Sequence, residues 1–147
     1  MVNIKLNHIY CIGIDPDTNK SGVGCWSRIG KPILTTMGFF ELFDFLKENK
    51  DCIHCVIIEA GWLNKSTWHG IGKGSFVVAK IGKNVGANHE TGKKIIELCK
   101  YLNIRYTLSR PAKTKLNAKK FKSITGITET TNPEKRDAFM LAFGYIL

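Results

Sequence analysis

The sequence predicts a single mixed α/β domain, residues 1–147, with a five-stranded sheet whose first three strands are antiparallel. A chain of 147 residues has the usual length of one domain. With 44% hydrophobic and 23% charged residues, it has the composition of a protein with a packed core. Strand-like and helix-like segments also follow one another in the order βββαβαβαα, which is typical of a sheet covered by helices.

The first half of the chain contains three predicted strands and a helix. Residues 8–15, 22–29 and 32–40 are rich in β-branched and apolar residues, and turn-forming residues separate them. Their short spacing indicates an antiparallel meander. Residues 41–49 are expected to form an amphipathic helix, with acids in its first turn and one apolar face, Leu42, Phe45 and Leu46.

The second half starts with the best candidate for a central strand, residues 53–59, which are almost all apolar and end at Glu59. A loop is expected over 61–75. Helical spacing over 76–102 predicts one long helix or two shorter ones, since its glycines weaken the first half. The remaining expected elements are a strand at 104–108, a basic helix at 112–123 and a helix at 133–146 that starts with proline.

The formal net charge of +10 is concentrated in one stretch of the chain. Residues 80–136 contain 14 of the 22 basic side chains and 4 of the 12 acidic ones. Clustered positive charge favours a polyanionic partner, and nucleic acid is the commonest one. A basic surface that only maintains solubility is the alternative.

Several classes of protein are not favoured. No apolar run reaches the ~20 residues of a membrane span, and no signal sequence opens the chain, so we expect a soluble cytoplasmic protein without membrane contact. Five cysteines suit a reducing compartment, and Cys52 and Cys55 lack the second ligand pair of a structural zinc site. The segment 86–94 departs from the P-loop pattern, so we expect no nucleotide cofactor.

Four carboxylates occupy places where they can meet. Asp15 ends the first predicted strand and Glu59 ends the fourth, while Glu134 and Asp137 share one face of the last helix. Each acid alone has an ordinary explanation as a turn residue, a residue near a helix N-terminus or a salt-bridge partner. Together, in a basic chain, they favour a site for divalent cations, which relieve the repulsion between clustered carboxylates.

Three segments containing these acids resemble one family. GIDPDTNKSGVG, VIIEAGW and EKRDAFMLA are similar, in this order, to the motifs of RuvC-type Holliday-junction resolvases in the RNase H-like nuclease superfamily. The resemblance implies an RNase H-like fold in which the four acids hold two Mg²⁺ ions, with Mn²⁺ as a substitute. Glu134 departs from the family's usual Asp or His, Asp17 from its glycine and Ser21 from its threonine.

The resemblance also implies roles for basic and aromatic residues. RPAKTKLNAKKFK is similar to the family's segment with lysines near the scissile phosphate, so Lys115 and one of Lys119 and Lys120 would be catalytic. In the family, an aromatic residue three positions after the second acid stacks on bases, and Trp62 stands at this spacing from Glu59. The alternative for Trp62 is a structural role in the core or in a loop. We expect further contacts with the DNA backbone from lysines: Lys80, Lys83, Lys93, Lys94, Lys113 and Lys122. For Lys113, Lys119 and Lys122 a solvated helix face is the alternative.

The expected function is a Mg²⁺-dependent endonuclease that resolves Holliday junctions in DNA recombination and repair. A homodimer would supply two active sites for paired symmetric cuts in branched DNA. Such a protein would be nucleoid-associated in the cytoplasm, and a short chain suits a phage or prophage enzyme as well as a bacterial one. The alternatives are another RNase H-like nuclease that cuts RNA–DNA hybrids or flaps, and a non-catalytic nucleic-acid-binding protein.

Overall fold

The structure is a computed structural model that describes residues 3–64 and 75–145, and within 75–81 it describes the backbone alone. Five strands form one sheet in the spatial order β3-β2-β1-β4-β5. β1–β3 form the predicted antiparallel meander, while β4 is parallel to β1 and β5 is parallel to β4. The strands are β1 (Tyr10–Asp15), β2 (Ser21–Trp26), β3 (Ile33–Met37), β4 (Ile53–Glu59) and β5 (Tyr106–Ser109).

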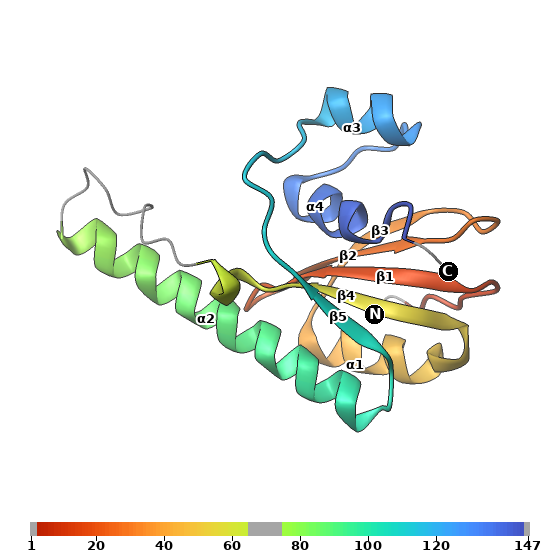
Figure 1. Ribbon diagram of the computed structural model, residues 1–147, viewed down its shortest axis with the longest axis horizontal. Coiled ribbons are helices and arrows are strands. Elements are labelled where there is room, and N and C mark those ends of the chain that lie inside the picture. Colours follow the sequence, from red (N-terminus) through yellow and green to blue (C-terminus); the bar gives the residue numbers. More distant parts are fainter. Residues whose placement is uncertain (1–2, 65–74, 146–147) are drawn as a thin grey trace.

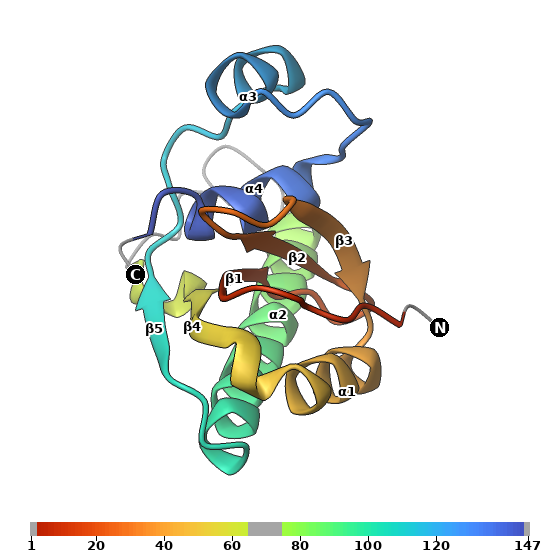
Figure 2. The ribbon, with the colours of Figure 1, turned by 90° about the vertical axis from the view of Figure 1, so that its right-hand side faces the viewer.

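Helices cover both faces of this sheet. Figure 1 and Figure 2 show α1 (Phe39–Glu48) and α2 (Ser75–Tyr101) on one face. On the opposite face lies α4 (Pro133–Ala142), with α3 (Ala118–Thr125) beyond it. Short 3₁₀ turns, η1 (Lys50–Cys52) and η2 (Gly61–Leu63), precede and follow β4. The predicted fold class and element order are therefore confirmed.

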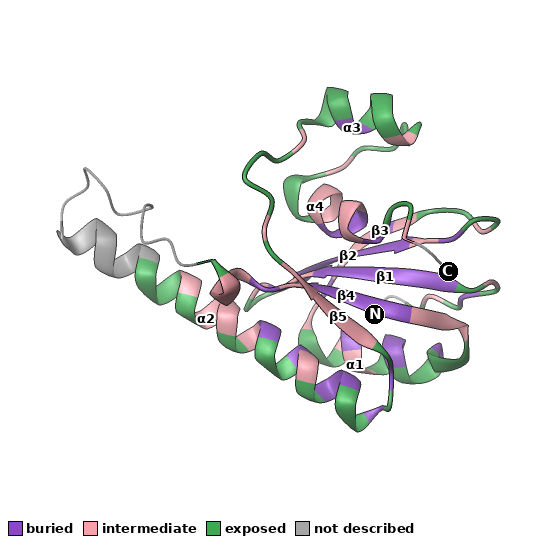
Figure 3. Ribbon diagram, in the orientation of Figure 1, coloured by how far each residue is buried: buried purple, intermediate pink, exposed green. Residues whose placement is uncertain are grey.

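The main core lies between the sheet and the α1/α2 layer. β1, β2 and most of β4 are buried, as Figure 3 shows. Their apolar residues pack against Leu42 and Leu46 of α1 and against Ile95 and Cys99 of α2. α2 is one continuous helix despite its three glycines, and its buried residues Ile95, Leu98 and Cys99 lie at helical spacing in its second half.

Glycines on β1 and β2 allow α4 to lie directly on the other face. A Cβ atom at Gly13 would overlap the carbonyl oxygen of Ala138, and one at Gly24 would overlap the backbone of Phe139. Glycine in a strand often marks such a close approach of another backbone. The position of α4 over the sheet therefore depends on strand residues that have no side chain.

The basic segment 112–123 is not helical throughout, contrary to the prediction. Residues 112–117 are irregular, and α3 begins at Ala118 because Asn117 caps it: the Asn117 Oδ1 accepts a hydrogen bond of 2.8 Å from the Lys120 N–H. Lysine-rich composition suggested a helix, but the capping residue sets its start. Lys113 and Lys115 consequently lie in a loop.

The other boundaries are close to the predictions. β4 has the expected residues, β1 ends at Asp15 as expected, and the remaining strand ends differ by one to three residues. The last helix ends at Ala142 instead of residue 146, and Gly144 follows with a left-handed φ of 73°. The predicted loop over 61–75 starts with η2, and its residues 65–74 lie outside the described residues. No helix among the described residues is long and apolar enough to cross a membrane.

Candidate active site

Asp15 and Glu59 lie next to each other at one edge of the sheet. Ile14 of β1 is paired with Ile58 of the parallel β4, so the two acids follow at equivalent positions. Both side chains are partly buried. The parallel pairing of two strands that are far apart in the sequence thus creates the first half of the predicted site.

α4 supplies the other two acids at the same edge. Asn132 caps this helix through a 2.9 Å hydrogen bond from the Lys135 N–H, and Pro133 occupies its first turn. A Cβ at Gly22 of β2 would overlap the backbone of Glu134, so the start of α4 lies directly on the sheet. Asp137 is partly buried and Glu134 is exposed.

The four carboxylates influence one another electrostatically. Burial raises the pKa of Asp15 to about 7, and the negative charges of Glu59, Asp137 and Glu134 add to this shift, while Lys115 opposes it. Burial also raises the pKa of Asp137, where Lys115 and Arg136 act in the opposite direction. The four predicted acids therefore lie close enough for the charges of three of them to raise the pKa of the fourth, Asp15.

Lys115 provides a positive charge within this group. Its Nζ lies 3.0 Å from Oε2 of Glu59 and 3.7 Å from Oδ2 of Asp137. Of the three lysines predicted to be catalytic, Lys115 is the one that contacts the acids in the part of the chain that the structure describes. Lys119 and Lys120 are exposed on α3.

The donor set suits a hard divalent cation, because carboxylate oxygens are the ligands that Mg²⁺ prefers. The carboxylates come from β1, β4 and α4, and the pKa of Asp15 is raised first by burial and then by the negative charges of the other acids. In the described ranges, however, no three acidic, histidine or cysteine side chains are grouped closely enough to hold an ion as they stand. The residues therefore fit Mg²⁺ by chemistry, and Lys115 is the cation that contacts them in this structure.

Sequence reasoning missed Arg136, which fixes the loop that contains Lys115. Its Nε donates a 3.3 Å hydrogen bond to the carbonyl oxygen of Leu116, and its Nη1 donates to the backbone oxygen and the Oγ1 of Thr131. Leu116 also packs against a buried cluster with Phe121 and Phe139. An arginine next to the predicted acid Asp137 was the signal available in the sequence.

Trp62 lies near the acids in sequence but packs on α2. Its ring is partly buried, with its centroid 6.0 Å from that of His89, and a Cβ at Gly92 would lie 2.7 Å from the ring. The Nζ of Lys93 is 5.9 Å from the ring centroid. These contacts correspond to the packing role considered for this residue, and its stacking on bases stays a prediction.

The lysines predicted to contact DNA are spread over two regions. Lys93 and Lys94 are exposed on α2 and form ion pairs of 3.4 and 3.1 Å with Glu90 and Glu97, respectively, on the same helix. Three others are exposed: Lys83 on α2, Lys113 in the loop and Lys122 on α3. The side chain of Lys80 lies outside the described residues.

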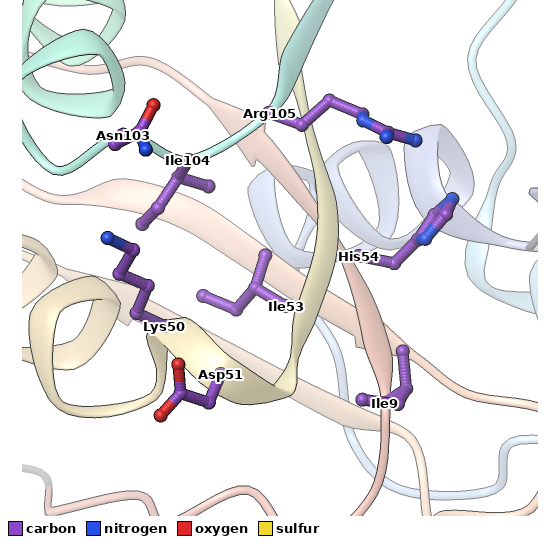
Figure 4. Close-up of a pocket in the computed structure, with 8 residues that line it drawn as sticks. All are labelled: Ile9, Lys50, Asp51, Ile53, His54, Asn103, Ile104 and Arg105. Carbon is purple, nitrogen blue, oxygen red and sulfur yellow. The ribbon is translucent and has the colours of Figure 1, made fainter.

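A separate pocket of about 470 Å³ lies at the opposite edge of the sheet, where β4 and β5 begin. Basic and polar side chains line it, but Figure 4 shows Lys50 extending away from the side where Arg105 and His54 lie. Its positive groups do not converge on one point. The carboxylate edge is therefore the better candidate for chemistry.

Comparisons with known proteins agree with this architecture. No protein-family model and no curated protein sequence matches the chain. Among solved structures, the chain is similar to T. thermophilus RuvC in complex with a Holliday junction substrate, with a TM-score of 0.54 and 16% identity over 92% of this chain and 91% of that one. It is also similar to another Thermus thermophilus RuvC structure, with a TM-score of 0.50 and 15% identity over 91% of each chain. The chain therefore has a RuvC-like form of the RNase H-like fold.

Proposed function

We propose that this protein is a divalent-metal-dependent endonuclease that resolves Holliday junctions by paired cuts. The observation that carries the proposal is that Glu59 and Asp137 both contact Lys115 at one sheet edge, where Asp15 and Glu134 are close enough to interact with the same charges. The likeness to a RuvC structure bound to a junction substrate supports branched DNA as the substrate.

The residues of the site would divide the reaction between them. Asp15, Glu59, Glu134 and Asp137 would hold two Mg²⁺ ions, which supply an activated water and stabilise the leaving oxygen. Lys115 would stabilise the negative charge that grows on the scissile phosphate, since a positioned ammonium interacts most strongly where charge develops. The basic residues of 80–136 would hold the DNA backbone.

A homodimer would place two such sites on one junction. Support for self-association comes from an aromatic surface on α1 and α2, formed by Phe39, Phe40, Phe43 and Tyr101. Phe40 is 81% exposed and Tyr101 is 79% exposed, which is unusual for neighbouring large side chains. Both helices carry exposed charges of both signs, Asp44, Lys47 and Glu48 on α1 and Lys94, Glu97 and Lys100 on α2. These would form a polar rim around the aromatic surface when α1 and α2 pair with a second copy.

The dimer can be tested by light scattering after size-exclusion chromatography. Phe40→Asp should shift the protein toward the monomer. Ile29→Asp is a matched control, because Ile29 is 79% exposed but lies outside the aromatic surface. Equal masses for both variants and the unchanged protein would contradict this interface.

The function can be tested with labelled DNA in the presence of Mg²⁺. The substrates are a four-way junction, a flap, an RNA–DNA hybrid and a linear duplex. We expect symmetric cuts in opposite strands of the junction and little cleavage of the duplex. Preferred cleavage of the hybrid or flap would instead favour a different nuclease of this fold. Binding without cleavage in Mg²⁺ or Mn²⁺ would favour a non-catalytic protein.

A further inference from the structure

The ammonium group of Lys115 lies where the proposed function requires a metal ion. It contacts carboxylate oxygens from two elements, Glu59 of β4 at 3.0 Å and Asp137 of α4 at 3.7 Å. Among the described residues, the ion pairs of these two acids are both made with Lys115. A cation from the chain itself thus occupies the space between carboxylates that are candidate metal ligands.

The acids at this edge repel one another without a cation. Asp15, Glu59 and Asp137 are partly buried and close enough to interact, so solvent screens their charges less than at an open surface. A single ammonium partly offsets this negative charge. A divalent ion would offset more of it, because carboxylates bind it directly through their oxygens.

The Lys115 side chain can leave this position without a change in the backbone. Its side chain is 40% exposed, whereas the side chains of Glu59 and Asp137 are 13% and 16% exposed. The following residue is fixed, since the Leu116 carbonyl accepts the hydrogen bond from Arg136 and the Leu116 side chain packs in the core. A long flexible stem on a fixed backbone permits the ammonium to move by rotamer changes alone.

We propose that Lys115 is a displaceable counter-ion: it holds Glu59 and Asp137 together before a divalent cation binds, and it gives up this position when the cation arrives. The inference rests on the proposed function, because that function places metal ions at these acids. Displacement would free the ammonium to face the scissile phosphate. Lys115 would thus compete with the metal first and assist phosphate chemistry afterwards.

Thermal unfolding in the absence of DNA tests this competition. Melting temperature is measured over a range of MgCl₂ concentrations at constant ionic strength, so that the half-saturating Mg²⁺ concentration can be obtained. The variants are Lys115→Gln, which removes the competing charge, and Lys115→Arg, which keeps it. Lys31→Gln is the control for net charge, because Lys31 is exposed between β2 and β3, outside the site and outside the aromatic surface.

We expect two changes in Lys115→Gln. Without Mg²⁺ it should melt at a lower temperature than the unchanged protein, because the acids lose their counter-ion. Its half-saturating Mg²⁺ concentration should fall on the order of fivefold. This factor corresponds to the strongest ion pairs measured at protein surfaces. Lys115→Arg and Lys31→Gln should remain near the unchanged protein.

Equal or weaker Mg²⁺ binding by Lys115→Gln would overturn the proposal, as would the absence of any Mg²⁺ effect on all four proteins. If the Gln variant does not fold, a crystal structure of the unchanged protein with Ca²⁺ decides: the Nζ should have left Glu59, and an Nζ still at 3.0 Å beside a bound ion would contradict displacement. Junction cleavage is measured separately. If the protein cleaves junctions but Lys115 does not compete with Mg²⁺, only this inference is rejected. If Lys115 competes with Mg²⁺ but the protein does not cleave junctions, only the proposed function is rejected.

Discussion

The backbone of Gly13 in β1 lies directly against the carbonyl group of Ala138 in α4, with no room for a methyl group between them. Ala138 follows Asp137, which belongs to the candidate active site. The contact that brings α4 onto the sheet therefore lies next to Asp137 on the helix and two residues before Asp15 on the strand. Packing and chemistry depend here on one missing side chain.

Gly13→Ala should destabilise the protein and weaken the site. The added methyl group must displace backbone atoms of α4, and overpacking of this kind costs about 1–3 kcal/mol. Urea denaturation measures the loss. Gly86→Ala is the control, because a Cβ at this α2 position would meet no atom within 4 Å among the described residues, and it should be neutral or stabilising by about 1 kcal/mol. Equal stability of both variants would contradict the close approach.

Asp15→Asn should abolish cleavage and leave junction binding intact. The amide keeps the shape of the side chain but removes the charge that would bind a metal. The cleavage rate should therefore fall by more than the roughly 100-fold that loss of an outer-shell partner of a ligand can cost. Cleavage is measured under single-turnover conditions and binding by fluorescence anisotropy. Asp51→Asn makes the same charge change at the opposite edge of the sheet and should cleave normally. Full activity of Asp15→Asn would rule out the proposed mechanism.

The metal-free protein should lose stability as pH rises between about 4 and 7. The pKa of Asp15 is raised from 3.8 to about 7 by burial and by the other acids, so the folded state binds a proton more tightly than the unfolded state does. Its protonated form therefore favours folding at low pH, and this contribution disappears as pH passes through the folded pKa. Chemical denaturation at several pH values in EDTA should show the slope in the unchanged protein, and Asp15→Asn should show a smaller one.

Cleavage should respond to pH in the opposite direction. Metal binding requires the ionised carboxylate, so at subsaturating Mg²⁺ the cleavage rate should increase as pH rises through about 7, the pKa of Asp15. High Mg²⁺ should move this increase to lower pH because the metal competes with the proton. A pH-independent rate at low Mg²⁺ would contradict the assignment of Asp15 as a ligand.

Junction affinity should fall steeply with salt if the basic stretch binds the DNA backbone. Each lysine that contacts a phosphate contributes about 0.9 to the slope of log affinity against log salt concentration. Lys113→Gln and Lys122→Gln should each reduce the slope by about one, since both side chains are exposed on the segment that carries Lys115. Lys31→Gln, outside this stretch, should leave the slope unchanged. A shallow slope in the unchanged protein would indicate that its charge serves solubility.

Local patterns in the sequence were sufficient for most elements. The apolar run at residues 53–59 predicted β4 without error, because a strand buried on both faces needs such a run. The basic segment was the main failure: lysines occur in helices and in loops alike, and only the Asn117 cap marks where α3 begins. The acids Asp15, Glu59, Glu134 and Asp137 were all predicted from their places at strand ends and on one helix face.

By itself, the sequence determined the order of the elements, the four acids and the concentration of positive charge in the second half. These follow from hydrophobic periodicity, turn residues and composition, which are local properties. Only the tertiary structure decided that Lys115 rather than Lys119 or Lys120 contacts the acids, that Arg136 fixes its loop, and that Trp62 packs on α2. Such contacts join residues that are distant in the chain, and they depend on how closely α4 approaches the glycines of β1 and β2.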